Sequence, residues 1–438
     1  MIVIPFIYFC LLTYYWWNKH QGYDVCVYMS SLYTLTSLLA IIIVANDLLD
    51  EGGILFDSYD LELNIVPTVF YCLFLTMGML PFSMIYRKEL KTIQANNPLL
   101  VDALSCFLIL IAFLNLYLVA DSTLEILSGD LSTIRNDHYE GIESPAEIKA
   151  ESMPYIFRFL YYFKTSTLLA IPLFFYYLCF KRRPLWFLLL LLFTSLSMPI
   201  AGIQSADRTE VVLYGMMFVS CLILFHPHLS RKIKMALRFI SIPIALAAIV
   251  YFVAVSDARF SKTEGGAATS ALQYAGQGYL NFCFFWEKAN KDHITAEREF
   301  PLIAHYVYHI DNDGDRRAVR SGQQGFFMSV FATYIGDVLL DLTPVGMILW
   351  VLTFFLIAVI IFKWPHREEL NIGELLIFYV LSIIPIFGIF YYRLMSFTYS
   401  FMVILAILLY ISDKFKFVIS TEEEGGEEEE EELKEETT

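Results

Sequence analysis

The chain has 438 residues, of which 57% are hydrophobic, 16% aromatic and only 17% charged. This composition excludes an ordinary soluble domain, in which about a quarter of the residues are charged. The net charge of −15 does not describe the whole chain, because residues 421–438 hold eleven Glu and one Lys and the remainder therefore carries only −5.

Apolar segments recur along the chain, each of roughly 17 to 25 residues, the length that a helix needs to cross about 30 Å of hydrocarbon. They show no strand-like alternation, and lipid leaves the edges of an open sheet without hydrogen-bond partners. We therefore predict an all-α polytopic membrane protein with about eleven transmembrane helices, at residues 2–17, 25–45, 64–85, 101–120, 155–180, 184–203, 209–225, 238–256, 343–362, 372–391 and 396–412.

The positions of Lys and Arg predict how these helices are oriented. Cations gather in every second connection, at residues 87–91, 181–183, 231–238 and 363–367. The short connections between them hold few cations or are acidic. By the positive-inside rule the basic connections are cytoplasmic, which puts the amino terminus outside and the carboxyl terminus in the cytoplasm.

Residues 1–412 are predicted to form a single transmembrane domain with two long outer loops, 121–153 and 257–325. Loops of this length between short connections are usually functional. Residues 413–438 are predicted to be an acidic, disordered cytoplasmic tail, because a run of like charges cannot form a core. Of the seven cysteines only Cys283 falls in an outer loop, so no disulfide is expected on that side.

Five cations lie where the outer side of the membrane is expected. A charge in or beside a membrane helix is costly and is therefore a candidate for function. They are Arg135 in the first outer loop, Arg158 and Lys164 in the outer half of one helix, Arg208 at a junction of two helices, and Arg259 at the start of the second outer loop. We expect the last four of these to converge on one outer cavity.

These cations also have plainer interpretations. Arg208 can pair with a neighbouring carboxylate, Asp207 or Glu210, and Arg158 can extend to the lipid headgroups. The cation of the first outer loop can neutralise the carboxylates of that acidic loop. Arg393, on a short outer turn, is expected only to anchor a helix end among headgroups.

The second outer loop combines aromatic rings with histidines. Residues 274–287 alternate glycines with rings, among them Tyr274 and Tyr279, whose faces suit sugar rings. His305 and His309 are one helical turn apart on a shared face, a spacing that can bind a metal. Because Tyr306 occupies the place of the Glu in the zincin pattern, we predict no metal site here.

The segment at 326–350 is apolar yet carries Asp337 and Asp341, and we expect its first half to be a helix that lies along or re-enters the outer surface. This segment resembles the one that closes the long outer loop in Wzy-type oligosaccharide repeat-unit polymerases, which build O-antigen and capsular polysaccharides. The similar pattern consists of Thr333, Tyr334, Asp341 and Gly346. Three outer arginines also follow the order of that family, namely Arg135, Arg208 and Arg259.

The resemblance implies a fold of the C-type membrane glycosyltransferase class, with a large outer loop. It implies an enzyme that joins polyprenyl-diphosphate-linked oligosaccharide repeat units into a surface polysaccharide, without metal or cofactor, at the outer face of the bacterial inner membrane. Donor and acceptor are then both lipid-linked oligosaccharides held by the lipid bilayer. The resemblance also suggests a chain-length regulator and a flippase as protein partners, and no nucleic acid is expected.

This chemistry gives the residues their expected roles. A guanidinium binds two oxygens of a diphosphate at once and stabilises the charge that develops as the glycosidic bond breaks. A base must take the proton of the acceptor hydroxyl, and the candidates are two histidines and two aspartates. The predicted catalytic residues are Arg208, Arg259, His305, His309 and Asp341, and the predicted substrate-binding residues are Arg135, Arg158, Lys164, Tyr274, Tyr279, Tyr334 and Asp337.

Other classes of protein share part of this pattern. A lipid-carrier glycan ligase, or another membrane glycosyltransferase, would use the same groups. A transporter of lipid-linked oligosaccharides would need polar residues across many helix centres and two similar halves. A membrane O-acyltransferase would centre on a His within or at the edge of a helix. The intramembrane charges gather toward one face and no His lies in the middle of a predicted span, so the sequence favours the polymerase.

Overall fold

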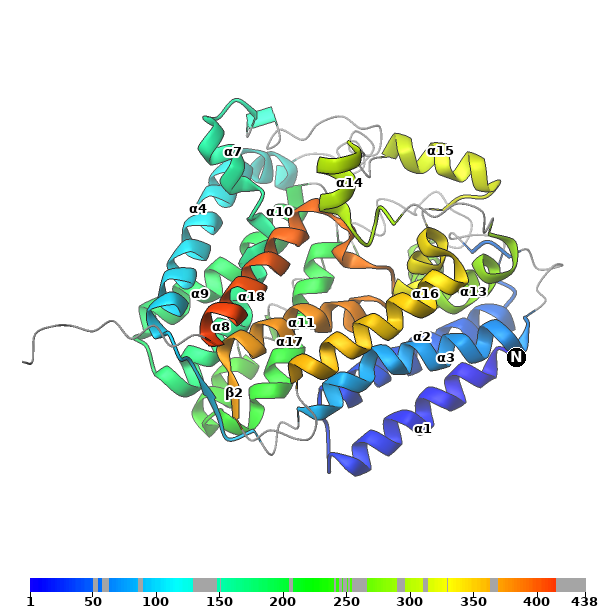
Figure 1. Cartoon of the computed structure of the whole chain (residues 1–438), viewed down its shortest axis with the longest axis horizontal. Helices are drawn as coiled ribbons and strands as arrows, with labels where there is room; N and C mark the ends of the chain where they lie inside the picture. Colours follow the sequence, from blue (N-terminus) through cyan, green and yellow to red (C-terminus); the bar gives the residue numbers. More distant parts are fainter. Residues whose placement is uncertain are drawn as a thin grey trace, which may run out of the picture.

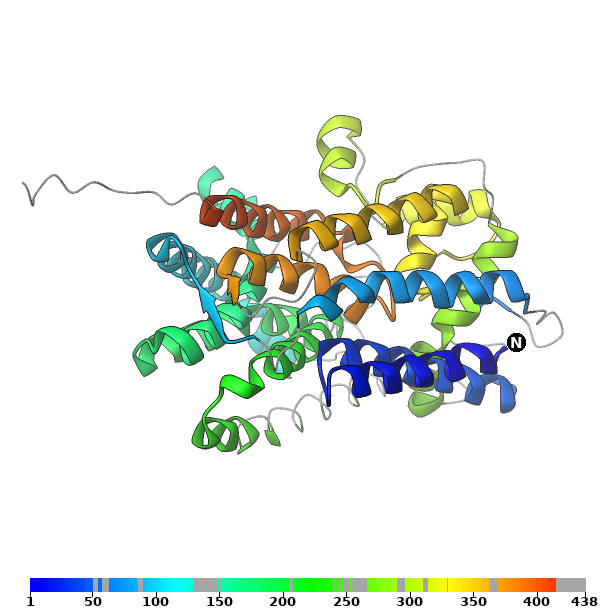
Figure 2. The same ribbon diagram turned by 60° about the horizontal axis from the view of Figure 1, so that its bottom comes forward.

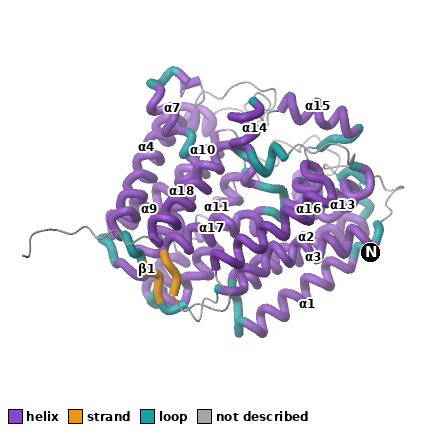
Figure 3. Tube along the Cα trace, in the orientation of Figure 1, coloured by secondary structure: helices purple, strands orange, loops and turns teal. Residues whose placement is uncertain are grey.

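The computed structural model is almost entirely helical over the part of the chain that it describes, apart from two strands of three residues each (Figures 1 and 3). That part comprises residues 1–49, 54–56, 63–85, 90–128, 148–149, 151–204, 208–239, 242–243, 246, 250, 253, 266–289, 296–309, 314–328, 330–362 and 369–414.

Helices occupy the predicted spans wherever the structure describes them; the predicted span at 238–256 lies largely outside the described residues. They confirm the all-α fold. The helices are α1 (Val3–Lys19), α2 (Val25–Ala45), α3 (Ile65–Met79) with η1 (Leu80–Met84), α4 (Pro98–Ser128), α7 (Tyr155–Tyr161) with η2 (Lys164–Leu169), α8 (Ala170–Tyr176) and η3 (Tyr177–Lys181), α9 (Leu185–Ser195) with α10 (Ser197–Gln204), α11 (Thr209–Phe225) with η4 (His226–His228), α16 (Thr333–Phe362), α17 (Ile372–Phe387), η5 (Arg393–Met395) and α18 (Phe397–Lys414).

Not every one of these helices is long enough to cross a bilayer by itself. Within the described residues seven helices are long and apolar enough, and an eighth span results if the pair Tyr155–Tyr161 and Lys164–Lys181, bent by 50°, counts as one. The apolar helix Ile372–Phe387 is shorter. These helices confirm a polytopic membrane protein, whereas the count of eleven crossings stays a prediction.

The connections predicted to be cytoplasmic meet at one end of the bundle. There β1 (Thr92–Gln94), which follows α3, pairs in parallel with β2 (Glu369–Asn371), which follows α16. The backbone N–H of Asn96 donates to Asp413 at the end of α18, 2.8 Å away. Arg183, between η3 and α9, pairs with Asp102 near the start of α4. We call this the basic end and the opposite one the distal end; Figure 2 shows the long helices running alongside one another between them.

In the segment predicted as the second outer loop, the described residues form three helices: α13 (Gly266–Lys288), α14 (Pro301–Tyr308) and α15 (Gly314–Gln324). α13 packs against α2, α3 and α16 instead of lying outside the bundle. Cys283, expected in an outer loop, is fully buried on this helix. Hydropathy does not reveal α13, because Gly, Gln and Asn residues alternate with its aromatic rings and lower the average hydropathy of the segment.

α16 consists of two helical halves. Thr343 has a left-handed backbone (φ 64°) immediately before Pro344, whose missing N–H and ring interrupt helical hydrogen bonding. Every residue from Thr333 to Asp341 is buried, so the first half re-enters the protein instead of lying along its surface. The backbone N–H groups of Thr333 and Tyr334 donate to carbonyls of residues 390 and 388, which joins α16 to the turn between α17 and α18.

Replacing Gly276 with Ala is expected to destabilise the folded chain. The added Cβ would lie 2.8 Å from the carbonyl carbon of Leu39 and 2.9 Å from the amide nitrogen of Ala40, backbone atoms that cannot move aside alone. Overpacking of this kind costs about 1–3 kcal/mol. Gly215→Ala is the matched control, because nothing lies within 4 Å of its added Cβ. Thermal unfolding in detergent should give a lower midpoint for Gly276→Ala alone, and equal midpoints would contradict the close packing of α13 on α2.

Candidate functional site

A group of buried charges lies at the distal end, where the segment before α14 and helix α15 meet the first half of α16. Asp337 and Asp341 are four residues apart, so their carboxylates lie on one face of the helix. Both side chains are almost wholly buried. We call the group the charged cluster; its members are Glu297, Arg298, Glu299, Arg320, Asp337 and Asp341.

The two aspartates of the charged cluster are fully engaged with donors. Asp337 pairs with the Arg298 guanidinium and accepts a 2.7 Å hydrogen bond from the backbone N–H of Tyr392. Asp341 accepts from the guanidinium of Arg320 at 2.7 Å and from the backbone N–H of Arg298 at 3.1 Å. Buried carboxylates that hold this many donors are structural ion-pair partners. In this conformation both carboxylates are occupied by these donors, and the roles of Asp341 as a base and of Asp337 in substrate binding stay predictions.

Glu299 is the exception in the charged cluster. Its side chain is 8% exposed, and neither carboxylate oxygen has a hydrogen-bond partner among the described residues. Burial raises the pKa of this carboxyl well above its ordinary value of 4.5, and the negative charge of Asp341 raises it further. Glu299 is therefore a neutral, protonated group at a pH where an ordinary Glu is ionised.

A second buried ion pair lies beside the charged cluster, on the turn between α17 and α18. The guanidinium of Arg393 pairs with Glu210 at the start of α11, and it donates to the hydroxyl oxygens of Tyr391 at 2.9 Å and Tyr399 at 3.1 Å. Tyr399 in turn donates to Glu210 at 3.1 Å. The Arg393 side chain is 12% exposed, so the expectation that it only anchors a helix end among headgroups is wrong.

A row of aromatic rings connects this ion pair to Arg208. The Arg208 guanidinium carbon lies 5.9 Å from the centre of the Tyr274 ring, within the range of a cation–π contact. Tyr274 packs edge-on against Phe331 at 5.2 Å, and Phe331 stacks on Tyr391 at 5.7 Å. We call Tyr274, Phe331 and Tyr391 the aromatic row. It lies between two guanidinium groups, Arg208 at one end and Arg393 at the other.

Two more predicted residues lie near the start of α18. The ring of His305 on α14 lies 4.7 Å from that of Phe397. Lys164 donates to the hydroxyl of Tyr161 at 2.8 Å, and the next residue on its helix, Thr165, bonds to the carbonyl of Thr398. Lys164 and Arg208 have separate partners, Tyr161 and Tyr274, and the predicted convergence of the outer cations on one cavity stays a prediction.

Other predicted site residues do not join this group. His309 follows the end of α14 with a left-handed backbone (φ 53°), so it does not share a helix face with His305. Arg158 is exposed on α7. Arg135 and Arg259 lie outside the described residues. In the described part of the chain, no three His, Cys, Asp or Glu side chains are arranged to hold a metal ion.

Two predicted sugar-binding tyrosines are core residues. The hydroxyl of Tyr279 lies 2.7 Å from that of Thr68, and the hydroxyl of Tyr334 donates to the carbonyl of Phe74 at 3.2 Å. Both rings are buried, and Tyr334 packs beneath Gly388, where a Cβ would lie 2.6 Å from the ring. Both rings are enclosed in this conformation, and the substrate-binding role of the two tyrosines stays a prediction.

Sequence reasoning missed the partners of the buried acids. Arg298 and Arg320 lie in a segment taken as a loop, and Glu299 directly follows Arg298 in the same segment. A signal was present, because two aspartates in an apolar helix require cations or protons to be buried. Comparison of the chain with protein-family models, curated proteins and solved structures found no match.

Glu299 predicts a pH dependence of stability. Because the pKa of Glu299 is raised in the folded chain, its contribution to folding stability is fully present below about pH 4.5. This stability is lost as the pH rises through the folded-state pKa. Glu299→Gln should therefore gain thermal stability relative to the parent as the pH is raised from 4.5 to 9. Glu151→Gln, at an exposed site, should track the parent throughout. Parallel melting curves for all three chains would show that Glu299 is not a buried neutral acid.

Proposed function

We propose that this protein is a polymerase that joins polyprenyl-diphosphate-linked oligosaccharide repeat units into a surface polysaccharide, as the resemblance to Wzy-type enzymes implies. The observation that supports the proposal best is the aromatic row between Arg208 and Arg393 at the distal end. Guanidinium groups suit a diphosphate, and ring faces suit sugars. A lipid-linked oligosaccharide carries both.

In this proposal the donor diphosphate approaches along the membrane to Arg208, which begins α11 at the distal end. The bond between the anomeric carbon and the diphosphate oxygen breaks, and the carbon forms a new bond to the acceptor oxygen. The diphosphate leaves with the electron pair, and a guanidinium that holds two of its oxygens stabilises the added charge. Arg393 is already neutralised by Glu210, so it positions the aromatic row and is not assigned to the anion.

The proton of the acceptor hydroxyl needs a base. Asp337 and Asp341 are engaged with arginines, which leaves His305 and His309 of the four candidates from the sequence. His305 is half-buried beside the start of α18, close to the Arg393 network, whereas His309 is exposed beyond the end of α14. The geometry favours His305 for this role.

Loss of the gene tests the class of reaction. A cell without this protein should accumulate single lipid-linked repeat units and display one-unit glycans at most, because every later addition needs the polymerase. Mass spectrometry of its glycolipids makes the measurement. Full-length polysaccharide lacking only a substituent would point instead to an acyltransferase, and repeat units trapped on the cytoplasmic side would point to a transporter.

Arg208→Lys tests the bidentate contact with the diphosphate. Lysine keeps the charge but loses the planar fork, and one charge-assisted hydrogen bond is worth roughly 1.5 to 3 kcal/mol, or about 10- to 150-fold in rate if it strengthens in the transition state. Polymer formation from purified lipid-linked substrate is the measurement.

The matched control for this substitution is Arg231→Lys, an exposed arginine at the basic end, which should retain the parent rate. Arg393→Lys is unsuitable as a control, because it disturbs a buried ion pair. A parent-like rate for Arg208→Lys would exclude a bidentate role for Arg208.

A further inference from the structure

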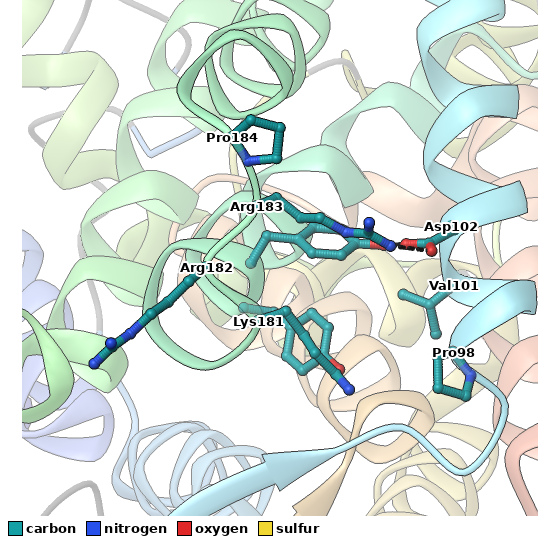
Figure 4. A pocket seen from close by; sticks show the side chains of 9 residues that line it. Pro98, Val101, Asp102, Lys181, Arg182, Arg183 and Pro184 are labelled. Atoms are coloured by element: carbon teal, nitrogen blue, oxygen red, sulfur yellow. Dashed lines mark hydrogen bonds and ion pairs between the residues drawn. The ribbon is translucent and has the colours of Figure 1, made fainter.

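A cavity of about 300 Å³ lies at the basic end, far from the aromatic row and the charged cluster. Its walls come from the start of α4, from the end of η3 and from the turn that leads into α9 (Figure 4). The chain reverses sharply there, because Arg182 has a left-handed backbone (φ 46°) and Pro184 follows two residues later. Three cations, Lys181, Arg182 and Arg183, line the cavity with Asp102.

Arg183 is held in a fixed orientation. Its guanidinium pairs with one oxygen of Asp102, while the hydroxyl of Tyr177 donates to the other oxygen at 2.6 Å. The guanidinium carbon also lies 5.9 Å from the centre of the Tyr177 ring. Ser105 donates to the Tyr177 hydroxyl at 3.3 Å and extends the network into α4. These contacts favour one orientation of the guanidinium, although its side chain is 44% exposed.

The side chains facing the cavity carry a net positive charge. Figure 4 shows Lys181 and Arg183 directed to the side where Asp102 lies, whereas Arg182 points away. The lining holds three cations and one carboxylate, which leaves a formal charge of +2. Lys181 is exposed and makes no hydrogen bond or ion pair with any described residue. Unlike Arg393, Arg183 keeps a 44% exposed side chain beside its carboxylate partner, so its remaining N–H groups can still donate. Together with the exposed ammonium of Lys181 it offers donors that suit a phosphate.

Exposed apolar side chains directly follow two residues of the lining, Pro98 and Pro184. Leu99 on α4 is 74% exposed, and Leu185 and Trp186 at the start of α9 are 70% and 67% exposed. In a membrane protein such side chains contact lipid, and Trp is enriched at the level of the headgroups. A phosphate bound in the cavity would therefore have acyl chains within reach of these residues. This apolar border distinguishes an amphiphilic ligand from a soluble anion.

We propose that this cavity binds the phosphate of an anionic membrane phospholipid between Lys181 and Arg183, with its acyl chains against Leu185 and Trp186. The lipid would join α4 to the turn between η3 and α9, two elements that Asp102 and Arg183 already connect. Bound lipid therefore stabilises the basic end of the bundle. The proposal is independent of the reaction at the distal end.

The test uses the full chain, purified in a neutral detergent and supplied with phosphatidylglycerol or phosphatidylcholine. Native mass spectrometry should show phosphatidylglycerol retained by the parent, and thermal unfolding should show a higher midpoint with phosphatidylglycerol than with phosphatidylcholine. Lys181→Gln should weaken retention about tenfold, the effect of one lost charge-assisted hydrogen bond. Lys232→Gln, which removes an exposed cation elsewhere at the same end, should leave retention unchanged.

Three results would overturn the proposal. Equal loss of phosphatidylglycerol in the Lys181 and Lys232 variants would mean that overall charge, not this cavity, retains the lipid. Stabilisation of the parent by inorganic phosphate equal to that by phosphatidylglycerol would indicate a site for soluble anions. Phosphatidylglycerol binding that appears only after truncation beyond Lys416 would mean that the acidic tail occupies the cavity. Arg183→Gln serves as a second variant, with the melting midpoint in detergent alone reporting any loss of folding.

Discussion

The distal half of the molecule depends on one requirement, that a buried charge have a partner. Asp337 and Asp341 lie in a helix whose residues are all buried from 333 to 341. Removing one member of a buried ion pair costs about 3–5 kcal/mol, because it leaves the other charge uncompensated. Arg298 and Arg320 meet this requirement, and they thereby fix the segment before α14 and the helix α15 against α16. These ion pairs thus contribute to holding α15 and the segment before α14 against α16.

One stretch of three residues connects the structural and the candidate functional parts of this end. Tyr391 belongs to the aromatic row, the backbone of Tyr392 bonds to Asp337, and Arg393 pairs with Glu210. Because neighbouring residues cannot move independently, a shift of α16 would displace the aromatic row and the Arg393 pair together. The charged cluster therefore acts on the candidate site by position, without contact with a substrate.

Hydropathy predicted the helices well, because exposure to lipid requires long apolar segments. The limits of α2 and α11 agree with the prediction, and α4 begins three residues before its predicted start. The same reasoning missed α13, since a helix buried among other helices can carry Gln277 and Asn281 if these find partners, as Asn281 does with the carbonyl of Phe331. The site was predicted only in part. Charge and ring content singled out Arg208 and Tyr274 as candidates. The ion pairs of Arg298 with Asp337 and of Arg393 with Glu210 join residues that are 39 and 183 positions apart, and no local sequence pattern reveals such pairs.

The break in α16 also bears on how the chain enters the membrane. Residues 344–362 form an apolar helix of their own, which can insert without the two aspartates that precede the break at Thr343. Ribosomal synthesis delivers Arg298 and Arg320 before either aspartate, so the carboxylates emerge when their counterions are already present. The two aspartates in the first half of α16 can then pair with those arginines as the segment folds. Pairing avoids the free-energy cost of moving an unpaired carboxylate into an apolar phase. The order of the charges along the chain thus matches the order in which a membrane-inserted chain needs them.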